Sequence, residues 1–240
     1  MTTPLEIGIY VPQMGFSYAD VLHRAQRCEE LGIGSLWLYD HMYGPPGVPP
    51  DIDSLEAWTL ATALLSRTER LRVGHMVLCN QFRHPAVLAK MATTLDQVSA
   101  GRLELGIGSG SIEDEHHRLG LDWGGTFAQR SDRLRETLEI LTQAFAEQRI
   151  DFSGTHYTVR DMSIKPGGPC SSRGHRSWWA GPARSTRCRW SRATPTCGMC
   201  RPTRSARWAQ AGRPAVVVCG HRPGPGHHRD VGRGGTGPGA

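Results

Sequence analysis

Acidic residues and lysine are almost missing from the last third of this sequence. Residues 166–240 contain one acidic residue, Asp230, and no lysine, but they hold 13 of the 28 basic residues, all of them arginine. The formal charge is therefore −6 over residues 1–165 and +12 over residues 166–240. The net charge of +6 consequently describes the last third, and it excludes a fold that is basic throughout.

Long apolar runs and clustered cysteines are also missing. No stretch approaches the 18 or so consecutive apolar residues of a membrane span, and no basic segment followed by an apolar one opens the sequence. Five of the seven cysteines follow residue 165, which leaves Cys28 and Cys79 before it. Two separated cysteines exclude a disulfide scaffold and suit a reducing compartment. The sequence therefore predicts a soluble, cytoplasmic protein without membrane contact.

A hydrophobic period is absent after Lys165, but before it strand and helix patterns alternate four times. The short apolar strands LEIGIYV, SLWLYD, LRVGHMVLC and RLELGIG begin near residues 6, 35, 71 and 103. Their spacing is the length of one strand–helix unit, which predicts an α/β fold with parallel strands, either a doubly wound sheet or an eightfold barrel. A barrel needs roughly 250 residues, so four units ending near residue 147 correspond to half of one.

Local signals place the helices and a hairpin between and after these strands. Ser17 with Asp20 forms a capping-box pattern, Ser54 is predicted to open the second helix, and Pro85 suits the first position of the third. Apolar residues at helical spacing mark a fourth helix, namely Leu134, Leu138, Leu141 and Phe145. Residues 151–165 alternate around a glycine turn and predict a β-hairpin insertion.

Polar residues follow two of the strands where catalytic groups of parallel α/β folds lie. Asp40 and His41 end the second strand, and Cys79 and Asn80 end the third. A structural interpretation stands beside the functional one: Asp40 caps the next turn, His41 is an ordinary polar residue, and the second pair belongs to a loop before a proline-initiated helix. The pattern alone leaves both interpretations open.

Three further motifs match known binding sequences only in part. GIGSGS, residues 106–111, resembles a phosphate-binding loop but lacks a third glycine placed to open a helix and the later acidic residue of a dinucleotide site, so its small residues favour close passage of a flat ligand. EDEHH, residues 113–117, carries metal-ligand side chains, but we interpret it as a solvated charge run on a loop and predict no metal site. CGMC, residues 197–200, has redox or zinc spacing within the arginine-rich part of the chain.

Several of these segments together resemble the luciferase-like flavin and deazaflavin monooxygenase superfamily. They are YDHMYG, NQFRHPAVLAKMATTLDQVSAGRLELGIGSG, EHHRLG and QRSDRLRETLEIL, and they are most similar to the actinobacterial branch that depends on coenzyme F420. The resemblance covers residues 5 to about 165. It implies a (β/α)8 TIM barrel of which residues 1–165 supply the first four to five units, with the cofactor ring at the carboxyl ends of the strands.

The resemblance also implies roles for residues of the strand ends. It places His41 and Asp40 near the reactive ring edge and the substrate, as catalytic and cofactor-binding residues. It matches Cys79 and Asn80 to a cofactor-binding position with a non-prolyl cis peptide bond behind the ring.

The loop after the fourth strand has implied roles as well. Gly106 and Gly108 match cofactor-binding positions of the cavity, and Glu115 matches a catalytic one. Ser109 and Ser111 replace Ala and Trp of many relatives, which leaves the shape of the substrate pocket open.

The chemistry implied is hydride transfer between F420 and a small organic substrate. His41 is the candidate proton donor or acceptor, because an imidazole changes its charge near neutral pH. An FMN-dependent monooxygenase of the same superfamily is the alternative, and a homodimer is possible for the full-length relative.

The arginine-rich part of the chain is explained by a shifted reading frame. Trp178, Trp179 and Ala180 require TGG TGG GCN, and reading from one base earlier gives Leu, Val or Met, then Val, then Gly, where relatives have a strand ending in Val-Gly-Gly. Residues 193–200, ATPTCGMC, permit Arg-Tyr-Ala-Asp-Val-Trp-Asn-Val in the same frame. We therefore predict that residues 166–240 are an irregular, out-of-frame tail and that the chain as written is inactive.

Nucleic-acid binding is the alternative interpretation of the basic tail. Thirteen arginines among four tryptophans could act as a nucleic-acid-binding arm by neutralising phosphates and stacking on bases. The absence of lysine and of regular spacing argues against this alternative, so nucleic acid is not an expected partner.

Overall fold

The computed structural model describes residues 7–44, 47–49, 51–165 and 178–181, the last of these by their backbone. Parallel strands form the sheet in the order β1 (Gly8–Tyr10), β2 (Ser35–Leu38), β3 (Arg72–His75) and β5 (Leu103–Gly108). The four predicted strands are thereby confirmed as neighbours.

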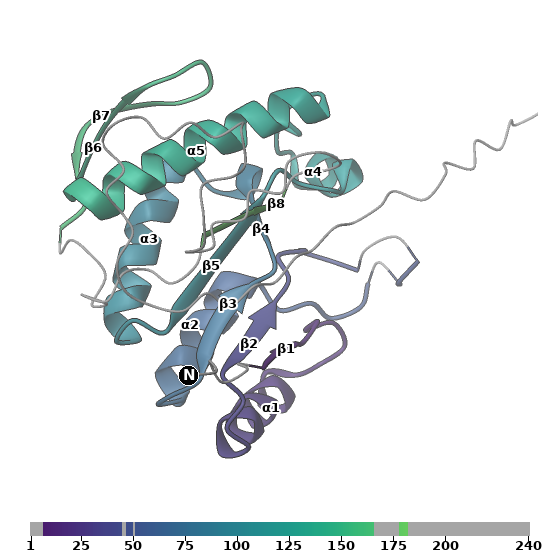
Figure 1. Ribbon diagram of the computed structural model, residues 1–240. Coiled ribbons are helices and arrows are strands. Elements are labelled where there is room, and N and C mark those ends of the chain that lie inside the picture. Colours follow the sequence, from purple (N-terminus) through teal and green to yellow (C-terminus); the bar gives the residue numbers. More distant parts are fainter. Residues whose placement is uncertain (1–6, 45–46, 50, 166–177, 182–240) are drawn as a thin grey trace, which may run out of the picture.

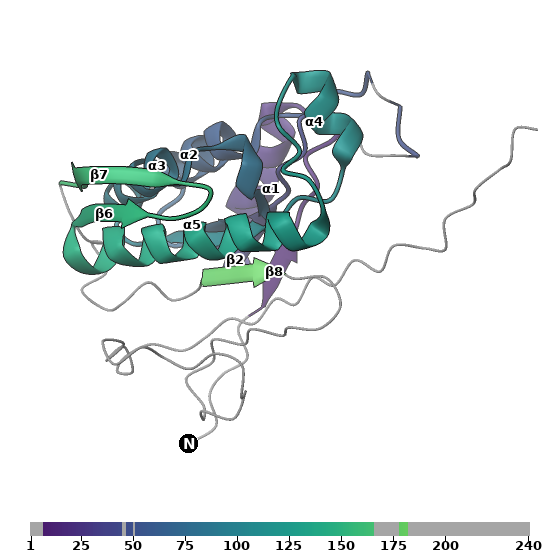
Figure 2. The same ribbon diagram turned by 90° about the horizontal axis from the view of Figure 1, so that it is seen from above.

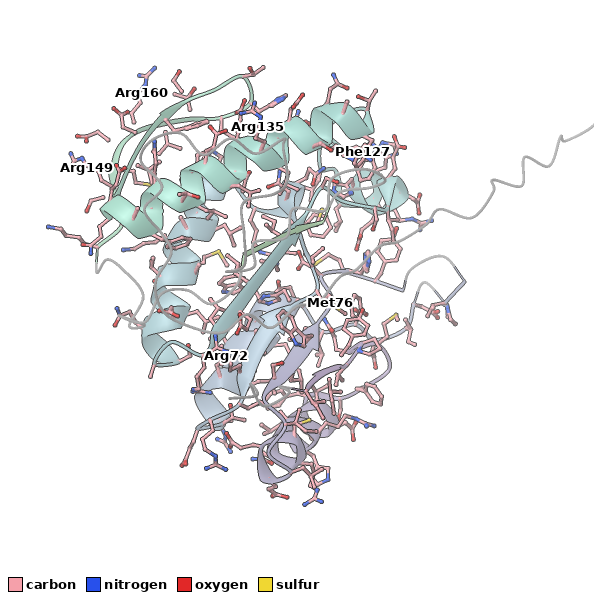
Figure 3. The ribbon with its side chains drawn as sticks, viewed as in Figure 1. Arg72, Met76, Phe127, Arg135, Arg149 and Arg160 are labelled. Carbon is pink, nitrogen blue, oxygen red and sulfur yellow. The ribbon has the colours of Figure 1, made fainter. Side chains whose placement is uncertain are left out.

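The third predicted strand is divided into two. After β3, the short strand β4 (Leu78–Cys79) pairs with the carboxyl-terminal half of β5. A non-prolyl cis peptide bond joins Met76 and Val77 between these two strands, in the middle of the sheet (Figure 3). The prediction of a cis bond at Cys79–Asn80 was therefore wrong by three residues, because the bond lies between β3 and β4 rather than at the end of the whole apolar run.

Helices cover one side of this sheet. They are α1 (Tyr18–Glu30), α2 (Ala57–Arg67), α3 (Pro85–Val98) and α5 (Phe127–Glu147). Figure 2 shows these helices above β2 and β8, which are strands of the sheet. The core lies between the two layers, where Leu36, Leu38 and Ile107 are fully buried against helix residues such as Leu64 and Leu88. A sheet with helices on one face is the wall of a barrel, and this excludes the doubly wound alternative for the described residues.

Local capping explains where the helices begin. The capping box of Ser17 and Asp20 starts α1, and Pro85 is the first residue of α3, both as predicted. The second helix begins later than predicted, at Ala57, because Glu56 accepts hydrogen bonds from the first N–H groups of α2. The hydroxyl of Ser54 instead contacts the Tyr39 hydroxyl and the His41 carbonyl.

The predicted hairpin is confirmed. Strands β6 (Arg149–Ser153) and β7 (Thr158–Ser163) are antiparallel and lie along α5 (Figure 1). The buried Glu136 of α5 accepts backbone hydrogen bonds from three successive residues of the hairpin turn, Thr155, His156 and Tyr157. This carboxylate therefore attaches the hairpin to the helix.

One short segment of the predicted tail has regular structure. Residues Trp178–Gly181 form β8, parallel to the edge of β5 opposite β4. The prediction of an irregular chain after residue 165 was therefore wrong for these four residues, since a strand ladder uses backbone groups that every sequence has. The other residues of the predicted tail, including CGMC, lie outside the described residues. None of the described helices is long and apolar enough to span a membrane.

Gly106 is predicted to be indispensable for the sheet. A Cβ atom there would lie 2.2 Å from the His75 carbonyl oxygen and 3.3 Å from a Val77 methyl group. We expect Gly106→Ala to lower the free energy of unfolding by about 3 kcal/mol, because backbone must move to relieve the overlap. Urea denaturation measures this, with Gly34→Ala as the control, since its Cβ would meet the nearest atom at an ordinary 3.6 Å. A loss below about 1 kcal/mol for Gly106→Ala would contradict the packing argument.

Candidate active site

The residues predicted from the strand ends lie together at one edge of the sheet. Asp40 and His41 follow β2, Cys79 ends β4, and Asn80 begins the short helix η1 (Asn80–Phe82). β4 is held beside the end of β5, where Cys79 pairs with Gly108. Parallel pairing thus brings the carboxyl ends of separate strands to one place, as catalytic sites of such folds require.

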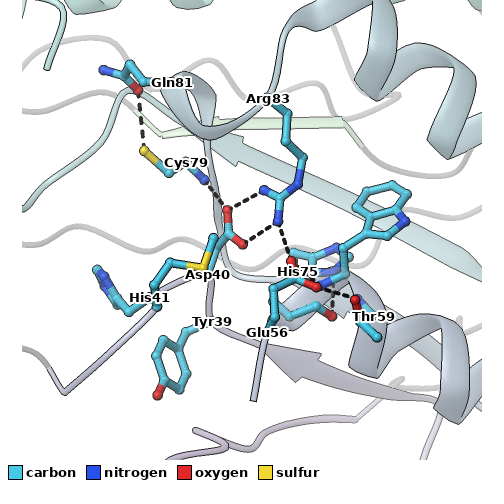
Figure 4. A network of polar contacts seen from close by, with 12 residues as sticks. Tyr39, Asp40, His41, Glu56, Thr59, His75, Cys79, Gln81 and Arg83 are labelled. Carbon is cyan, nitrogen blue, oxygen red and sulfur yellow. Dashed lines mark hydrogen bonds and ion pairs between the residues drawn. The ribbon is translucent and has the colours of Figure 1, made fainter. Parts of the chain in front are cut away.

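Asp40 is the centre of a buried ion pair (Figure 4). Its two carboxylate oxygens accept hydrogen bonds of 2.8 and 3.0 Å from the guanidinium of Arg83, and Oδ2 also accepts the Cys79 N–H at 2.8 Å. Burial raises the pKa of Asp40, whereas Arg83 and the Cys79 amide oppose that shift by stabilising the carboxylate. Both oxygens are engaged, so this carboxylate is arranged to hold neighbouring groups in place.

Arg83 contacts a second carboxylate as well. Its Nη2 lies 2.5 Å from Glu56 Oε1, and Glu56 also caps α2. Burial works against the charge of Arg83, but the carboxylates of Asp40 and Glu56 together raise its pKa. Burial likewise opposes the charge of Glu56, yet the α2 N–H groups and Arg83 lower its pKa. The guanidinium therefore joins the end of β2 to the start of α2.

His41 pairs with Glu115. Its Nδ1 lies 2.9 Å from Glu115 Oε2, and Glu115 Oε1 accepts the Met42 N–H at 2.5 Å. The Glu115 side chain is 3% exposed, whereas that of His41 is 29% exposed. The carboxylate keeps the proton of the neutral ring on Nδ1, which leaves Nε2 as the acceptor on a partly exposed imidazole. This arrangement suits proton transfer.

Glu115 lies on a helix where a loop was predicted. Residues Glu113–Leu119 form α4, which ends at Gly120 in the left-handed region with φ 67°. Acidic side chains in its first turn and basic ones in its last turn favour the helix dipole, and this local signal was missed. Glu115 and His116 are buried, so the prediction of a solvated charge run was wrong for these two.

Cys79 is a half-buried, protonated thiol. Its Sγ lies 3.4 Å from both Gln81 Oε1 and His116 Nε2. Burial raises the pKa of Cys79 to about 12. A thiol with this pKa is not a nucleophile at neutral pH, so its place in the site is structural.

Asn80 is a buried residue with one side-chain oxygen unpaired within the described part of the chain. It is 2% exposed, and its Nδ2 lies 3.4 Å from the Tyr157 hydroxyl. Its Oδ1 has no hydrogen-bond partner among the described residues. A buried polar atom left unpaired at a strand end is a position where a ligand can complete the bonding.

Gly106 and Gly108 meet the chain that follows β3. A Cβ at Gly108 would lie 2.8 Å from a Val77 methyl group, as one at Gly106 would meet the His75 carbonyl. Packing against this segment accounts for both glycines, and contact with a cofactor stays a prediction for them. Ser109 lies at the strand end, where its carbonyl accepts bonds from Gln81 at 2.8 Å and Arg130 at 3.2 Å.

Arg83, Glu56 and Gln81 were not predicted as site residues from the sequence. The available signal was the polar segment NQFR between an apolar strand and a proline-initiated helix, because a charged residue there must find partners at the strand ends. The partners themselves were not visible, since Glu56 and Asp40 precede Arg83 by 27 and 43 residues.

The buried His75 beside this network predicts a loss of stability in acid. Its ring stacks on Trp58, and burial, followed by the positive charge of Arg83, lowers its pKa to about 4 from an ordinary 6.5. The unfolded chain therefore binds the proton first, so the contribution of His75 is complete above pH 6.5 and decreases as the pH falls to 4. We expect this to remove about 3 kcal/mol from the free energy of unfolding.

Urea denaturation at pH 7 and pH 4 measures this loss. His75→Phe keeps a ring against Trp58 and has no proton to bind, so its stability should fall by about 3 kcal/mol less than that of the parent chain over this range. Equal losses for both proteins would show that His75 does not titrate as described.

Sequence comparison places the chain among known proteins. Residues 1–182 match the family described as luciferase-like monooxygenase. An F420-dependent glucose-6-phosphate dehydrogenase of Microbacterium testaceum (strain StLB037) is 34% identical over 165 residues, which is 68% of this chain and 48% of that protein. One of Amycolatopsis mediterranei (strain U-32) is 33% identical over 164 residues, which is 67% of this chain and 47% of that protein. The chain thus spans about half the length of the curated relatives it matches.

Solved structures show the same fold. An F420-dependent secondary alcohol dehydrogenase in complex with an F420–acetone adduct has a TM-score of 0.64 at 22% identity, covering 74% of this chain and 52% of that one. A riboflavin lyase with modified FMN and riboflavin has a TM-score of 0.62 at 16% identity, covering 77% of this chain and 51% of that one. These likenesses and the described sheet confirm the predicted barrel class, and with the family match they lead to one conclusion. The chain belongs to the luciferase-like monooxygenase family.

Proposed function

We propose that this chain carries the first part of the active site of an F420-dependent oxidoreductase that exchanges hydride with a small organic substrate. The observation that carries the proposal is the His41–Glu115 pair, a partly exposed imidazole held at 2.9 Å by a buried carboxylate at the strand ends. The 34% identity to an F420-dependent glucose-6-phosphate dehydrogenase supports the choice of cofactor.

The described residues fit one wall of a site for a flat ring. Gly108, Ser109 and Gly110 place small residues where β5 ends, and the unpaired Oδ1 of Asn80 supplies a buried polar group nearby in the fold. Small residues let a planar group approach the backbone, and a polar atom without a partner is suited to orient it. Asn80 and the β5 end would therefore hold the ring.

The proposed roles follow from the hydrogen bonds. When bound, the deazaflavin supplies or accepts the hydride. His41 Nε2 takes the hydroxyl proton of an alcohol or returns it to a carbonyl oxygen, and Glu115 stabilises the imidazolium formed in the first case. Asp40, predicted as a catalytic residue, has both oxygens engaged by Arg83 and Cys79, so in this proposal proton transfer belongs to His41.

Cofactor titration of the protein with its reading frame restored near codon 169 tests the proposal. We expect fluorescence titration to show tighter binding of F420 than of FMN, and hydride exchange with glucose 6-phosphate as the first substrate to try. FMN is the alternative, because solved structures of this fold include a monooxygenase component in complex with FMN. Tighter binding of FMN would replace F420 in the proposal, and binding of neither would reject it.

A further inference from the structure

Arg83 joins three segments that surround the candidate active site. Its guanidinium binds Asp40 at the end of β2 through two hydrogen bonds of 2.8 and 3.0 Å. It also binds Glu56 at 2.5 Å, at the start of α2 (Figure 4). Arg83 itself follows η1, so β2, α2 and η1 meet at one side chain.

The effect of Arg83 reaches the backbone of the site through Asp40. Asp40 Oδ2 receives both the Arg83 Nη1–H and the Cys79 N–H, each at 2.8 Å. The Cys79 peptide precedes Asn80, and Asp40 precedes His41. The orientation of the Asp40 carboxylate therefore determines the position of the two segments that carry Asn80 and His41.

Burial makes this arrangement depend on the shape and charge of a guanidinium. The side chain of Arg83 is 11% exposed and that of Asp40 is 2% exposed. One cation lies between two carboxylates, so its removal leaves a buried negative charge without a partner. A lysine would supply the charge but not the planar pair of donors that binds both Asp40 oxygens.

We propose that Arg83 is a positioning residue of the candidate active site, which acts through Asp40 and the Cys79 amide to place His41 and Asn80. The importance of this placement for catalysis rests on the proposed function. The placement itself can be measured without a cofactor, because the Cys79 thiol reports whether the segment from β4 to η1 stays closed.

The experiment compares the alkylation of Cys79 by iodoacetamide in the full chain and its variants, with peptide mass spectrometry to separate the cysteines. Cys79 is half-buried, and the buried Cys28 of α1 serves as the internal reference. We expect Arg83→Gln to accelerate alkylation of Cys79 by about tenfold or more while Cys28 is unchanged, because a local opening exposes one site and global unfolding exposes both. In Arg83→Lys, the alkylation rate of Cys79 should lie between those of the parent chain and Arg83→Gln.

Arg135→Gln is the matched control. Arg135 pairs with Glu139 at 2.8 Å on the exposed face of α5 and makes no hydrogen bond to Asp40, Glu56 or Arg83, so its replacement should change neither alkylation rate. Alkylation of Cys79 at the parent rate in Arg83→Gln, or equal acceleration of both cysteines, would overturn the inference.

Two further variants keep the test decisive if Arg83→Gln does not fold. Iodoacetamide must still alkylate Cys79 faster in Arg83→Lys than in the parent chain, and an equal rate would overturn the inference. In Asp40→Asn/Arg83→Gln, both charges are replaced by amides that can bind each other, so Cys79 should be protected relative to Arg83→Gln. A double variant as reactive as Arg83→Gln would argue against coupling through Asp40.

A cofactor titration separates this inference from the proposed function. In the frame-restored protein, Arg83→Gln should weaken F420 binding by about tenfold, the cost of a misplaced ring contact. If Arg83→Gln leaves both the Cys79 reactivity and F420 binding unchanged, the positioning role is rejected and the proposed function stands. If Arg83→Gln accelerates alkylation of Cys79 but not of Cys28, and the frame-restored protein binds neither F420 nor FMN, the proposed function is rejected and the positioning role stands.

Discussion

Restoring the reading frame near codon 169 is expected to create F420 binding at least about 100-fold tighter than that of the chain as written. Within the described residues, β1 and β8 are the outer strands of the sheet, and each pairs on one side only. Such a wall contacts one side of a ring, and the contacts from the remainder of a barrel are needed to order and hold the ligand. The chain as written should therefore retain no cofactor.

Equilibrium dialysis and fluorescence titration of both proteins measure this difference. The chain spans about half the length of its curated relatives, 48% of the one from Microbacterium testaceum, so the restored residues should supply the missing wall. Binding of F420 by the unrestored chain as tightly as by the restored one would contradict the frame-shift interpretation of residues 166–240.

Replacing His41 is expected to have the next largest effect. In the frame-restored protein, His41→Asn should lower kcat by about 10²- to 10⁴-fold, because asparagine keeps a polar side chain but transfers no proton. Cofactor affinity should change far less, since the ring is held by other groups in the proposal. Absorbance of F420 during turnover, with glucose 6-phosphate tried first, provides the measurement.

Two variants serve as references for His41→Asn. His23→Asn changes an exposed histidine of α1 and should leave kcat unaltered. Glu115→Gln keeps an acceptor for the Nδ1 proton but removes the charge, so it should lose activity by a smaller factor, about tenfold. If His41→Asn retains more than about a tenth of the kcat, a group other than His41 transfers the proton.

The elements of the fold were largely predictable from local sequence. The Ser17–Asp20 capping box, Pro85 at the start of α3 and the apolar strands depend on residues a few positions apart. They appear where they were predicted, except that the third strand is divided into β3 and β4. The start of α2 was misplaced because two capping residues were available. Glu56 accepts the helix N–H groups, while Ser54 contacts Tyr39 instead.

The site was predictable in position but not in its bonding. Strand ends identified Asp40 and His41, and the resemblance to a family identified Glu115. No sequence signal indicated that Arg83 would occupy both oxygens of Asp40, or that the cis bond would lie at Met76–Val77. These features depend on where β3 ends and on how η1 is placed against β2.

The sequence by itself determined the alternation of strands and helices, the residues at the strand ends and the change in composition after residue 165. Each of these depends on period, capping or composition, which a single chain displays along its length. The tertiary structure alone decided the pairs His41–Glu115 and Asp40–Arg83, whose members are 74 and 43 residues apart. Such contacts require strand register and helix packing to bring distant residues within hydrogen-bonding distance, and the same packing buries the charges and so raises or lowers their pKa values.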